Sequence, residues 1–544
     1  MKERCRSVIL MLLAAGCVLL SACGKSGETA TPGAGSAEAP KSETPAAPTV
    51  PLPDENTLVI AISDEVEGLD VQQISYANIV NMLLTEPLIV YSTDLTKLYP
   101  SFAESFTLTD EYIEFVLPAD AKFSNGNILD AAALKASTER FLAISEYAGD
   151  LDTVTKVEVV DARTVRYYFS EPSPYSLATI SCVFGGIVDV AAAESVNEWE
   201  FNRHPVMNGP YRVEDWVAGS HIVLKRNEYF HTYNPELKNH GAPNFETVVI
   251  RFIPNAEECL SALKNGEVDC AYRAPISCLT GTENDPAFKH YTFQQPGVCY
   301  LNLNTERGAL TDAAVRQALT YAVDRDALND AVGGMVYPTF GFIAPAQAGY
   351  SPEEEALLAE KLMYDPARAK EILAEAGWKD SDGDGIVERG GQALRLNMML
   401  PADRASFTVV VPVLQKQFAA IGADVQVEYY EADFIKEMMR SGEYEIGSRA
   451  FEWNDADMLY WCFTEDSGYG WDDAELTALL NRARHVNDVA KRTEVYAEAS
   501  ERLAEAFKAI SLFSDDYVVV SKADLDGLVI ALDDRLWVND AVKK

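Results

Sequence analysis

The sequence predicts an α/β protein in which short apolar strands alternate with amphipathic helices. Hydrophobic residues make up 48% and charged residues 24% of its 544 residues, which is the composition of a globular protein. Runs rich in β-branched residues, such as 57–63 and 247–253, indicate buried strands. The apolar residues from Val315 to Ala322 have helical spacing and indicate a helix. Because both kinds of segment are mixed along the chain, the predicted class is α/β.

The individual elements follow from the same two periodicities. The expected strands are 57–63, 156–160, 164–169, 222–225, 247–253, 298–304, 394–400, 425–429 and 517–520. The expected helices are 76–84, 130–143, 256–265, 311–323, 366–376, 405–421, 432–440 and 473–509. The strands on either side of Asp161-Ala162-Arg163 alternate with period two, so they form a predicted hairpin.

The first 22 residues have the pattern of a bacterial lipoprotein signal peptide. A basic start, Lys2 to Arg6, precedes an apolar run over 8–20 that is too short to span a membrane. The run ends in Leu20-Ser-Ala-Cys23, which resembles the lipobox before whose cysteine a signal peptidase cuts. We therefore expect Cys23 to carry a diacylglycerol on its sulfur and a further acyl chain, such as palmitate, on its new amine.

The residues after this cysteine predict a tether. Residues 23–55 contain mostly Gly, Ser, Ala, Thr, Pro and Glu, which cannot bury enough apolar surface to offset the entropy of ordering. We expect a flexible segment that ties the protein to the extracytoplasmic face of the bacterial cell membrane. Disulfides are permitted in that compartment, and the six cysteines beyond Cys23 could be paired or free.

Charge and metal-ligand spacing exclude several functions. The chain has 84 acidic and 45 basic residues, a formal charge of −39, and a nucleic-acid ligand is not expected because its binding needs a basic face. The nine cysteines contain no CxxC pair, and the six histidines contain no HxxxH pair, so a zinc enzyme is not expected either.

Several short segments share an order and spacing that are specific, although each alone is weak. They are Glu86-Pro-Leu-Ile-Val-Tyr91, Leu98-Tyr-Pro-Ser-Phe-Ala-Glu-Ser105, Lys122-Phe-Ser-Asn-Gly126, Asn208-Gly-Pro-Tyr211, Leu263-Lys-Asn-Gly-Glu-Val-Asp269, Val315-Arg-Gln-Ala-Leu-Thr-Tyr-Ala-Val-Asp324 and Gly442-Glu-Tyr-Glu445. Together, over nearly all of 57–520, they resemble the family 5 extracellular solute-binding proteins of bacterial ABC importers. That family includes oligopeptide-, dipeptide- and nickel-binding lipoproteins.

The resemblance implies a two-lobed periplasmic-binding-protein fold with a hinge and an extra domain on the first lobe. Carried over to this chain, the parts are 56–86, 206–295 and 512–544 for lobe one, 87–205 for the extra domain, and 296–511 for lobe two. The ligand would be enclosed as the lobes close. It would be a small solute, in the first place a peptide, which a monomeric binding protein delivers to the permease subunits.

The resemblance also implies a ligand anchor near Arg449. Peptide binders of the family carry a loop there whose aspartate holds the α-ammonium of the ligand, because a buried charge needs an ionic partner. The chain departs from that pattern, and Glu452, Asn454 and Asp455 each lie within one or two positions of the expected aspartate. Any of them could be the anchor, and the alternative for Asp455 is a helix N-cap.

Two arginines and several aromatic residues complete the predicted site. Arg404 and Arg449 lie near positions where peptide binders hold a carboxylate, for which a guanidinium is suited, although lone arginines often form salt bridges instead. The positions at which the first lobe of the family faces its ligand are, in this chain, Tyr76, Asn78 and Tyr272. Trp453 could stack on the ligand, or it could pack in the core.

A metal site is predicted outside this region. Asp380, Asp382 and Asp384 alternate in a loop that ends in Gly385, a spacing that can place three oxygens around a calcium ion. Gly391 stands where an EF-hand would have its last glutamate, and the alternative is an ordinary turn between a helix and a strand. Any bound calcium would be structural, and no other cofactor is expected.

Other functions stay open beside peptide binding. An oligosaccharide ligand would fit the tryptophans, whereas a nickel chelate is less favoured because 400–470 contains no histidine. A surface sensor on the same fold is an alternative. An enzyme is not expected, because the chain has no GxSxG or HExxH motif; the alternative in this class is a secreted hydrolase with a carboxylate pair such as Glu452 and Asp455.

Overall fold

The computed structural model describes residues 50–402, 404–533 and 535–544. The predicted signal peptide and Cys23 lie outside the described residues, as does the predicted tether as far as residue 49. Val50, near the end of the range predicted as tether, packs against the apolar cluster that contains Val59 and Val249. No helix among the described residues has the length and apolar character that crossing a membrane requires.

The largest sheet in the described part of the chain has 12 strands, and one half of it is built around a parallel core. The strands of this half are β1 (Thr57–Ile62), β8 (Tyr211–Val217), β9 (His221–Arg226), β10 (Thr247–Phe252), β11 (Cys270–Ala271) and β12 (Phe288–Gln294). β1 pairs in parallel with β10 and β11, whereas β8, β9 and β10 form an antiparallel run. Helices α1 (Ile79–Leu84), α6 (Ala256–Asn265) and α7 (Ile276–Thr282) belong to the same half.

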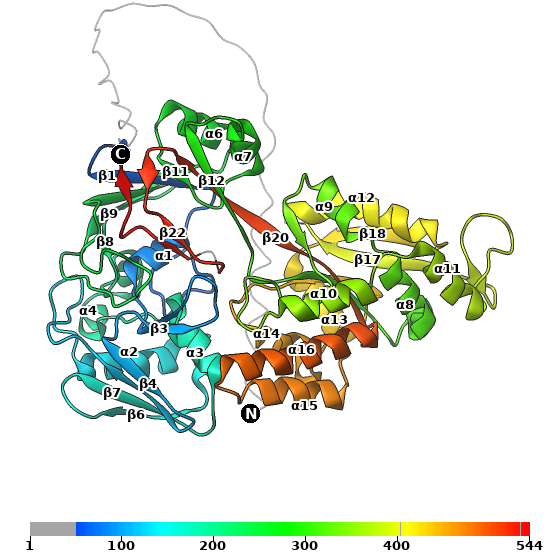
Figure 1. Cartoon of the computed structure of the whole chain (residues 1–544), viewed down its shortest axis with the longest axis horizontal. Helices are drawn as coiled ribbons and strands as arrows, with labels where there is room; N and C mark the ends of the chain where they lie inside the picture. Colours follow the sequence, from blue (N-terminus) through cyan, green and yellow to red (C-terminus); the bar gives the residue numbers. More distant parts are fainter. Residues whose placement is uncertain (1–49, 403, 534) are drawn as a thin grey trace, which may run out of the picture. The chain divides into compact units, whose positions relative to one another are not determined.

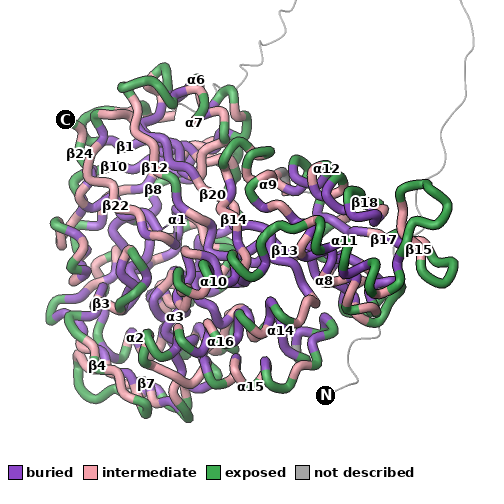
Figure 2. The backbone as a smooth tube through the Cα atoms, turned by 45° about the vertical axis from the view of Figure 1, so that its right-hand side comes forward, coloured by how far each residue is buried: buried purple, intermediate pink, exposed green. Residues whose placement is uncertain are grey.

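Both faces of β1 are buried, as its continuous apolar run predicts for a strand in a parallel sheet. Leu58 and Ile60 pack into one apolar cluster, whereas Val59 and Ala61 pack into another on the opposite face. The buried strands and the exposed loops are distinguished in Figure 2.

The second half of the sheet has its own parallel pairs. Its strands are β13 (Cys299–Leu303), β14 (Val336–Pro338), β17 (Arg395–Pro401), β18 (Asp424–Tyr430) and β19 (Ile446–Ala450). β17 pairs in parallel with both β18 and β19. The helices of this half are α8 (Ala313–Tyr321), α9 (Arg325–Ala331), α10 (Pro352–Lys361), α11 (Pro366–Glu375), α12 (Ala405–Ala420), α13 (Ala432–Ser441), α14 (Met458–Phe463), α15 (Ala474–Ala483) and α16 (Val489–Ala506).

One long strand, β20 (Ala509–Lys522), belongs to both halves of the sheet. Its first part pairs with β13 and β14, and its last part pairs with β11 and β12 (Figure 1). The chain crosses a second time between the end of β12 and the start of β13, where Gln295 donates its backbone N–H to the carbonyl of Asp515. These two adjacent crossings are the hinge of a two-lobed fold, so the predicted fold class is confirmed.

A separate sheet lies inside the range predicted as the extra domain. It has the order β4 (Ser105–Leu108), β5 (Tyr112–Val116), β7 (Thr164–Phe169) and β6 (Val154–Val159), and all of its pairs are antiparallel. Helices α2 (Ala131–Ile144) and α3 (Pro174–Ile180) contribute Leu134 and Leu177 to its apolar core, and α4 (Val190–Ser195) and α5 (Glu198–Arg203) follow them. The predicted hairpin on either side of Asp161 is formed by β6 and β7.

Most predicted elements are present, and one is wrong. The helix predicted over 473–509 is two helices, α15 and α16, followed directly by β20. The break has a local cause, because Asp488 accepts a hydrogen bond from the N–H of Lys491 and so begins a new helix. The strand predicted over 517–520 is only part of β20. The six described cysteines, Cys182, Cys259, Cys270, Cys278, Cys299 and Cys462, are all free thiols.

Candidate functional site

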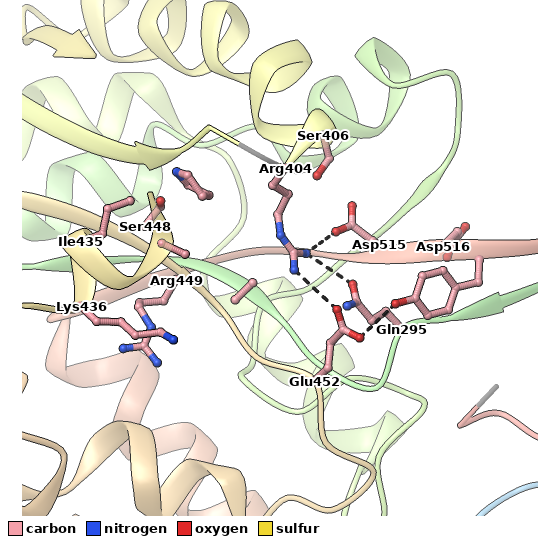
Figure 3. A pocket seen from close by; sticks show the side chains of 14 residues that line it. Gln295, Arg404, Ser406, Ile435, Lys436, Ser448, Arg449, Glu452, Asp515 and Asp516 are labelled. Carbon is pink, nitrogen blue, oxygen red and sulfur yellow. Dashed lines mark hydrogen bonds and ion pairs between the residues drawn. The ribbon is translucent and has the colours of Figure 1, made fainter. Parts of the chain in front are cut away.

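A cavity of about 450 Å³ lies beside the crossing strand β20 (Figure 3). Its charged and hydrogen-bonding lining residues are Gln295, Arg404, Ser406, Lys436, Ser448, Arg449, Glu452, Asp515, Asp516 and Tyr517. Pro401 ends β17 and Ala450 ends β19, and both strands run in parallel into the cavity wall. Ligand sites of α/β sheets form at the carboxyl ends of parallel strands, so the topology explains where this cavity lies.

Two of the predicted ligand residues contact each other in this cavity. Arg404 precedes the first turn of α12, and its Nη1 donates to Oδ2 of Asp515 at 2.6 Å. Its Nη2 lies 3.6 Å from Oε1 of Glu452, whose other oxygen accepts from the hydroxyl of Tyr517 at 3.1 Å. Arg404 is therefore held between two carboxylates, as the dashed contacts in Figure 3 show.

Arg449 lies apart from that cluster in the same cavity. Its guanidinium is 4.4 Å from the centre of the Tyr469 ring, and its Nη1 is buried and donates no hydrogen bond within the described chain. The side chains that act on it are those of Tyr300, Cys462 and Tyr469, of which Tyr469 also forms a hydrogen bond with the guanidinium, and none of them is a carboxylate. Its positive charge therefore has no carboxylate partner among the described residues.

Asp516 is a lining residue that the sequence analysis missed. Its pKa is raised to about 6, because burial and the neighbouring Asp515 raise the pKa by more than the hydrogen bond from Gln294 lowers it. That hydrogen bond is 3.4 Å long. Two adjacent aspartates in the middle of 509–522, a run rich in apolar residues, were the signal that could have revealed the site, because charged groups are costly to place in such a run.

A second cavity, of about 580 Å³, contains the residues predicted to face the ligand from the first lobe. Tyr76, Asn78 and Tyr272 all line it, together with three acidic residues between Ile62 and Gly68. Asn78 also caps α1, because its side-chain oxygen accepts from the N–H of Asn81 at 3.1 Å. The structure thus brings these three residues together, in a cavity other than that of Arg404.

The two cavities adjoin at the hinge. Arg273 lines the second cavity, and its guanidinium lies 4.0 Å from the ring centre of Tyr517, which lines the first. Arg273 has a backbone φ of 46°, in the left-handed region that a side chain other than glycine adopts at an energetic cost. Because Arg273 and Tyr517 connect the two cavities, a solute longer than one cavity can contact both.

The remaining candidates from the predicted anchor loop do not line either cavity. Trp453 stacks on Tyr147 and Phe184, with ring centres 6.1 Å and 5.9 Å away. Asn454 is buried, and its backbone carbonyl accepts from the N–H of Ala348. Both residues thus take part in packing, which was the alternative for Trp453.

Asp455 lies in a buried ion pair. Its side chain is fully buried, and its two oxygens accept hydrogen bonds of 2.6 Å and 2.8 Å from the guanidinium of Arg492. Oδ1 also accepts from the N–H of Asp457, two residues along the chain. Because its charge is already compensated away from both cavities, Asp455 does not suit the predicted role of ligand anchor. Of the three anchor candidates, only Glu452 lines a cavity.

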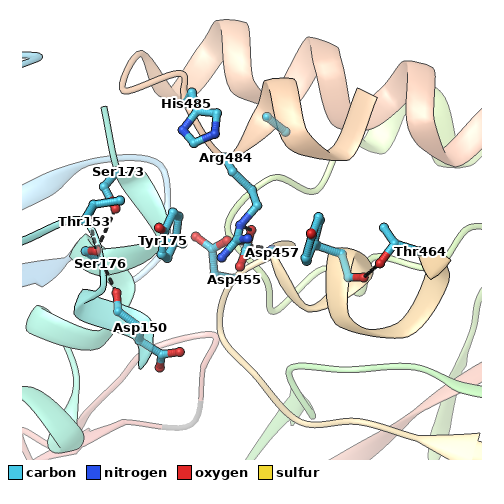
Figure 4. Close-up of polar contacts among 12 residues, drawn as sticks. Asp150, Thr153, Ser173, Tyr175, Ser176, Asp455, Asp457, Thr464, Arg484 and His485 are labelled. Atoms are coloured by element: carbon cyan, nitrogen blue, oxygen red, sulfur yellow. Dashed lines mark hydrogen bonds and ion pairs between the residues drawn. The ribbon is translucent and has the colours of Figure 1, made fainter. Parts of the chain in front are cut away.

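A second ionic contact lies beside this pair (Figure 4). Nε of Arg484 is 3.0 Å from Oδ1 of Asp457, but the two atoms are not aligned as a hydrogen bond. Burial raises the pKa of Asp457 to about 6, and Arg484 lowers it by less. The Arg484 guanidinium also lies 4.1 Å from the ring centre of Tyr175, a residue of α3. This contact joins the range predicted as lobe two to the range predicted as the extra domain.

The predicted calcium loop brings its carboxylates together. Ligand oxygens of Asp380, Asp382, Asp384 and Glu388 all lie within 4.8 Å of one another. Glu388 was not chosen from the sequence, and it belongs to the mostly exposed hairpin of β15 (Glu388–Arg389) and β16 (Gln392–Ala393). Asp380 accepts from the N–H groups of two glycines in the loop, which holds the turn in shape. Four carboxylates are suitable ligands for a hard cation, although calcium takes six to eight oxygens.

Comparison with known proteins assigns the fold to a family. Residues 97–471 match the bacterial extracellular solute-binding proteins, family 5 Middle. The chain is 25% identical over 382 residues to the oligopeptide-binding protein AppA of Bacillus subtilis, covering 68% of this chain and 66% of that protein. It is 24% identical over 472 residues to the glutathione-binding protein GsiB of Escherichia coli K12, covering 82% of this chain and 86% of that protein.

A solved structure has the same fold. The structure of NikA from Brucella suis in complex with Fe(III)-EDTA superposes with a TM-score of 0.78 at 22% identity, covering 90% of this chain and 100% of that one. At this identity the likeness concerns the fold. The match of the family model over most of the chain shows that the protein belongs to the family 5 extracellular solute-binding proteins of bacterial ABC importers.

Proposed function

We propose that this protein captures a small peptide-like solute in the cavity beside β20 and delivers it to the permease subunits of an ABC importer. The observation that carries the proposal is that the cavity wall presents charges of both signs, with Arg404 and Arg449 among its cations and Glu452 and Asp516 among its acids. A short peptide carries both signs at its ends. The volume of about 450 Å³ is in the range of small-molecule sites.

The hinge supports capture by closure. Both cavities adjoin at the contact of Arg273 with Tyr517, where the chain crosses between the two halves of the large sheet. A solute that contacts both sides would favour the closed arrangement, since only that arrangement provides all of its contacts. No bond of the solute needs to change, so binding and release are the whole of the proposed activity.

Relatives support the peptide class and one alternative. The oligopeptide binder AppA and the glutathione binder GsiB are both named for peptide ligands. The complex of NikA with Fe(III)-EDTA favours a metal chelate as the second candidate. Neither cavity is lined by a histidine or a cysteine from the described residues, so a chelate would be held by its own carboxylates. Neither is lined by a tryptophan, which disfavours an oligosaccharide.

We also propose that the mature protein begins at Cys23 and acts as a lipid-anchored monomer on the extracytoplasmic face of the membrane. The lipobox Leu20-Ser-Ala-Cys23 and the polar composition of 24–49 support this location. Two or more acyl chains provide stable attachment where one would not. A role as a surface sensor would use the same anchor and the same cavity, without a permease.

The test is to identify the solute that the protein retains. Protein purified from its own host is denatured, and the released solute is examined by mass spectrometry. A peptide is expected, and a peptide pool should raise the melting temperature of the refolded soluble form by mass action. Release of a metal chelate, with a shift by the chelate and none by peptides, would overturn the peptide class.

Delivery is tested separately in cells. A strain without the gene should lose uptake of a labelled peptide from the stabilising pool. Wild type should restore this uptake, and Arg404→Gln should not, because the variant leaves Asp515 and Glu452 without their cation. Arg368→Gln removes an exposed arginine of α11 that lines neither cavity, and it should restore uptake fully. Normal uptake in the deletion strain would favour the sensor alternative.

A further inference from the structure

We propose that Asp516 and Arg449 bind the two charged groups of the solute, Asp516 its cationic group and Arg449 its anionic group, so that the ligand is a zwitterion. The inference rests on the proposed function, and it identifies the two residues that select the ligand. It differs from the expectation drawn from the sequence, in which the cationic group belongs to the loop around Glu452. The charged groups of the cavity differ in whether a counter-charge within the chain already compensates them.

The other charges of the cavity have partners within the chain. Arg404 lies against Asp515 at 2.6 Å and against Glu452 at 3.6 Å. Glu452 also accepts from the hydroxyl of Tyr517. Lys436 lies 2.9 Å from Asp433, one turn earlier on α13. A solute charge placed on any of these groups would have to compete with the existing partner, so they contribute less to selecting it.

Arg449 is the cation of the cavity that has no such partner. Its Nη1 is buried and donates no hydrogen bond, and the ring of Tyr469 covers its guanidinium on one side. A buried donor that has lost its water and has no acceptor is unfavourable until an acceptor arrives. A carboxylate suits this position, because it can accept two parallel hydrogen bonds from one guanidinium.

Asp516 is the corresponding acid. The groups that act on its carboxylate are Gln294, which donates one hydrogen bond of 3.4 Å, and Asp515, which repels it. The nearby cation Arg404 is already paired with Asp515, at 2.6 Å. Burial without a cation raises the pKa of Asp516 to about 6, so the carboxylate is destabilised in the unliganded protein. An ammonium group of the solute would supply the missing charge.

The chemistry of both groups identifies the class of ligand. A primary ammonium and a carboxylate on one small molecule describe an unmodified short peptide or an amino-acid derivative. A solute with only one of the two charges would leave either Asp516 or Arg449 without a counter-charge in the cavity, where both are only partly exposed. The cavity therefore selects against N-blocked and C-blocked peptides by leaving a charge unpaired.

The experiment combines blocked ligands with single variants. A defined pool of tripeptides, the same pool N-acetylated, and the same pool amidated at the C-terminus are added to the soluble protein from residue 24, and the shift of the melting temperature is measured. Affinities are then measured for the tripeptide that shifts most and for its two blocked forms. The variants are Asp516→Asn and Arg449→Gln, with Glu371→Gln and Arg368→Gln, an exposed pair on α11, as matched controls.

The expected result is a loss of binding affinity only where a charged group of the ligand or its partner residue is removed. Each blocked form should bind wild type about tenfold to a hundredfold more weakly than the free tripeptide. Asp516→Asn should weaken the free tripeptide by a similar factor and leave the N-acetylated form unchanged, since that form has no ammonium. Arg449→Gln should weaken the free tripeptide and leave the amidated form unchanged. The control variants should bind all three as wild type does.

Several results would overturn the proposal. If wild type binds the N-acetylated and the free forms equally, Asp516 holds no ammonium, while peptide binding itself still stands. If Asp516→Asn weakens the acetylated form as much as the free form, the residue acts through structure only. If no pool raises the melting temperature, the zwitterion proposal and the peptide function both fail. Unliganded Asp516→Asn should melt at or above the wild-type temperature at pH 7.5, which excludes misfolding as the cause of weaker binding.

Discussion

The carboxylate of Asp455 and the guanidinium of Arg492 form a buried, doubly hydrogen-bonded ion pair, with contacts of 2.6 Å and 2.8 Å. The pair connects the loop after β19 to α16, 37 residues further along the chain. Arg492 Nη2 also donates to the hydroxyl of Tyr496, and its Nε donates to the carbonyl of Ala483 at the end of α15. This ion pair therefore connects three segments: the loop after β19, the end of α15, and α16.

The first prediction concerns the stability that depends on this pair. Asp455→Asn leaves Arg492 buried without its counter-charge, so the free energy of unfolding should fall by about 3–5 kcal/mol. Urea denaturation at pH 7 measures the change. Arg482→Gln breaks the exposed pair of Arg482 with Glu498 on the same two helices, and it should lower the free energy by less than about 1 kcal/mol. Equal effects of the two variants would contradict the structural role.

The second prediction is a pH dependence caused by Asp457. Its pKa is about 6 in the folded protein and 3.8 without the fold, because burial disfavours the charged form. The folded state therefore binds more protons between these values, and stability should decrease as pH rises from about 4 to about 7, by about 1–3 kcal/mol for this group.

Asp457→Asn tests this assignment. The asparagine has no charge to bury, so the part of the slope that belongs to this residue should disappear, and the variant should be more stable than wild type at pH 7. Asp516 has its pKa raised to about 6 in the same way, so a residual slope of the same sign should remain in the single variant. The slope should become smaller again in the double variant with Asp516→Asn, although other buried carboxyls with raised pKa values, such as Glu86 and Asp150, still contribute to it. The same pH dependence of stability in wild type and in the double variant would contradict both assignments.

The third prediction concerns the loop of Asp380, Asp382 and Asp384. If these carboxylates and Glu388 bind calcium, millimolar calcium should raise the melting temperature, and a chelator should reverse the rise. The double variant Asp382→Asn, Asp384→Asn should show no response, because two ligand charges are lost. Asp433→Asn, at an exposed aspartate outside the loop, should respond as wild type does. A melting temperature that calcium does not change would leave the loop as an ordinary turn.

The fourth prediction concerns the anchor. Full-length protein with Cys23→Ser should no longer incorporate labelled palmitate, and it should leave the membrane fraction or retain an uncleaved signal peptide. Mass spectrometry of the N-terminal peptide distinguishes these outcomes. Cys182→Ser, at a free thiol inside the fold, should be acylated at Cys23 as in wild type. Palmitate on the Cys23→Ser protein would show that another residue is modified.

Local patterns predicted most of the elements because local energetics determine them. The helix predicted over 256–265 matches α6, which Asn255 caps at its start and Gly266 ends in a left-handed conformation. The strand predicted over 57–63 matches β1 because a continuous apolar run is buried on both faces. The single helix predicted over 473–509 was wrong because the overall pattern concealed a local break. Helical spacing continued across a break that only the cap at Asp488 marks.

The site was predictable only in part. Arg404 and Glu452 were chosen from the sequence, and both line the cavity beside β20. Asp455 was chosen beside them, but its ion pair with Arg492 could not be read from a segment that contains only one of the partners. Asp516 was missed because its distinguishing property is the absence of a cation, and this depends on how distant segments pack around it.

By itself, the sequence determined the α/β class, most of the helices and strands, and a resemblance that identified the family. These follow from interactions between residues close in the chain and from their order along it. Only the tertiary structure decided which charges are compensated. Arg404 and Asp515 are 111 residues apart in the chain, and β20 brings them within 2.6 Å of each other. Electrostatic partners are set by distance in space, and for this reason the two residues proposed to meet a ligand, Arg449 and Asp516, could be chosen only from the tertiary structure.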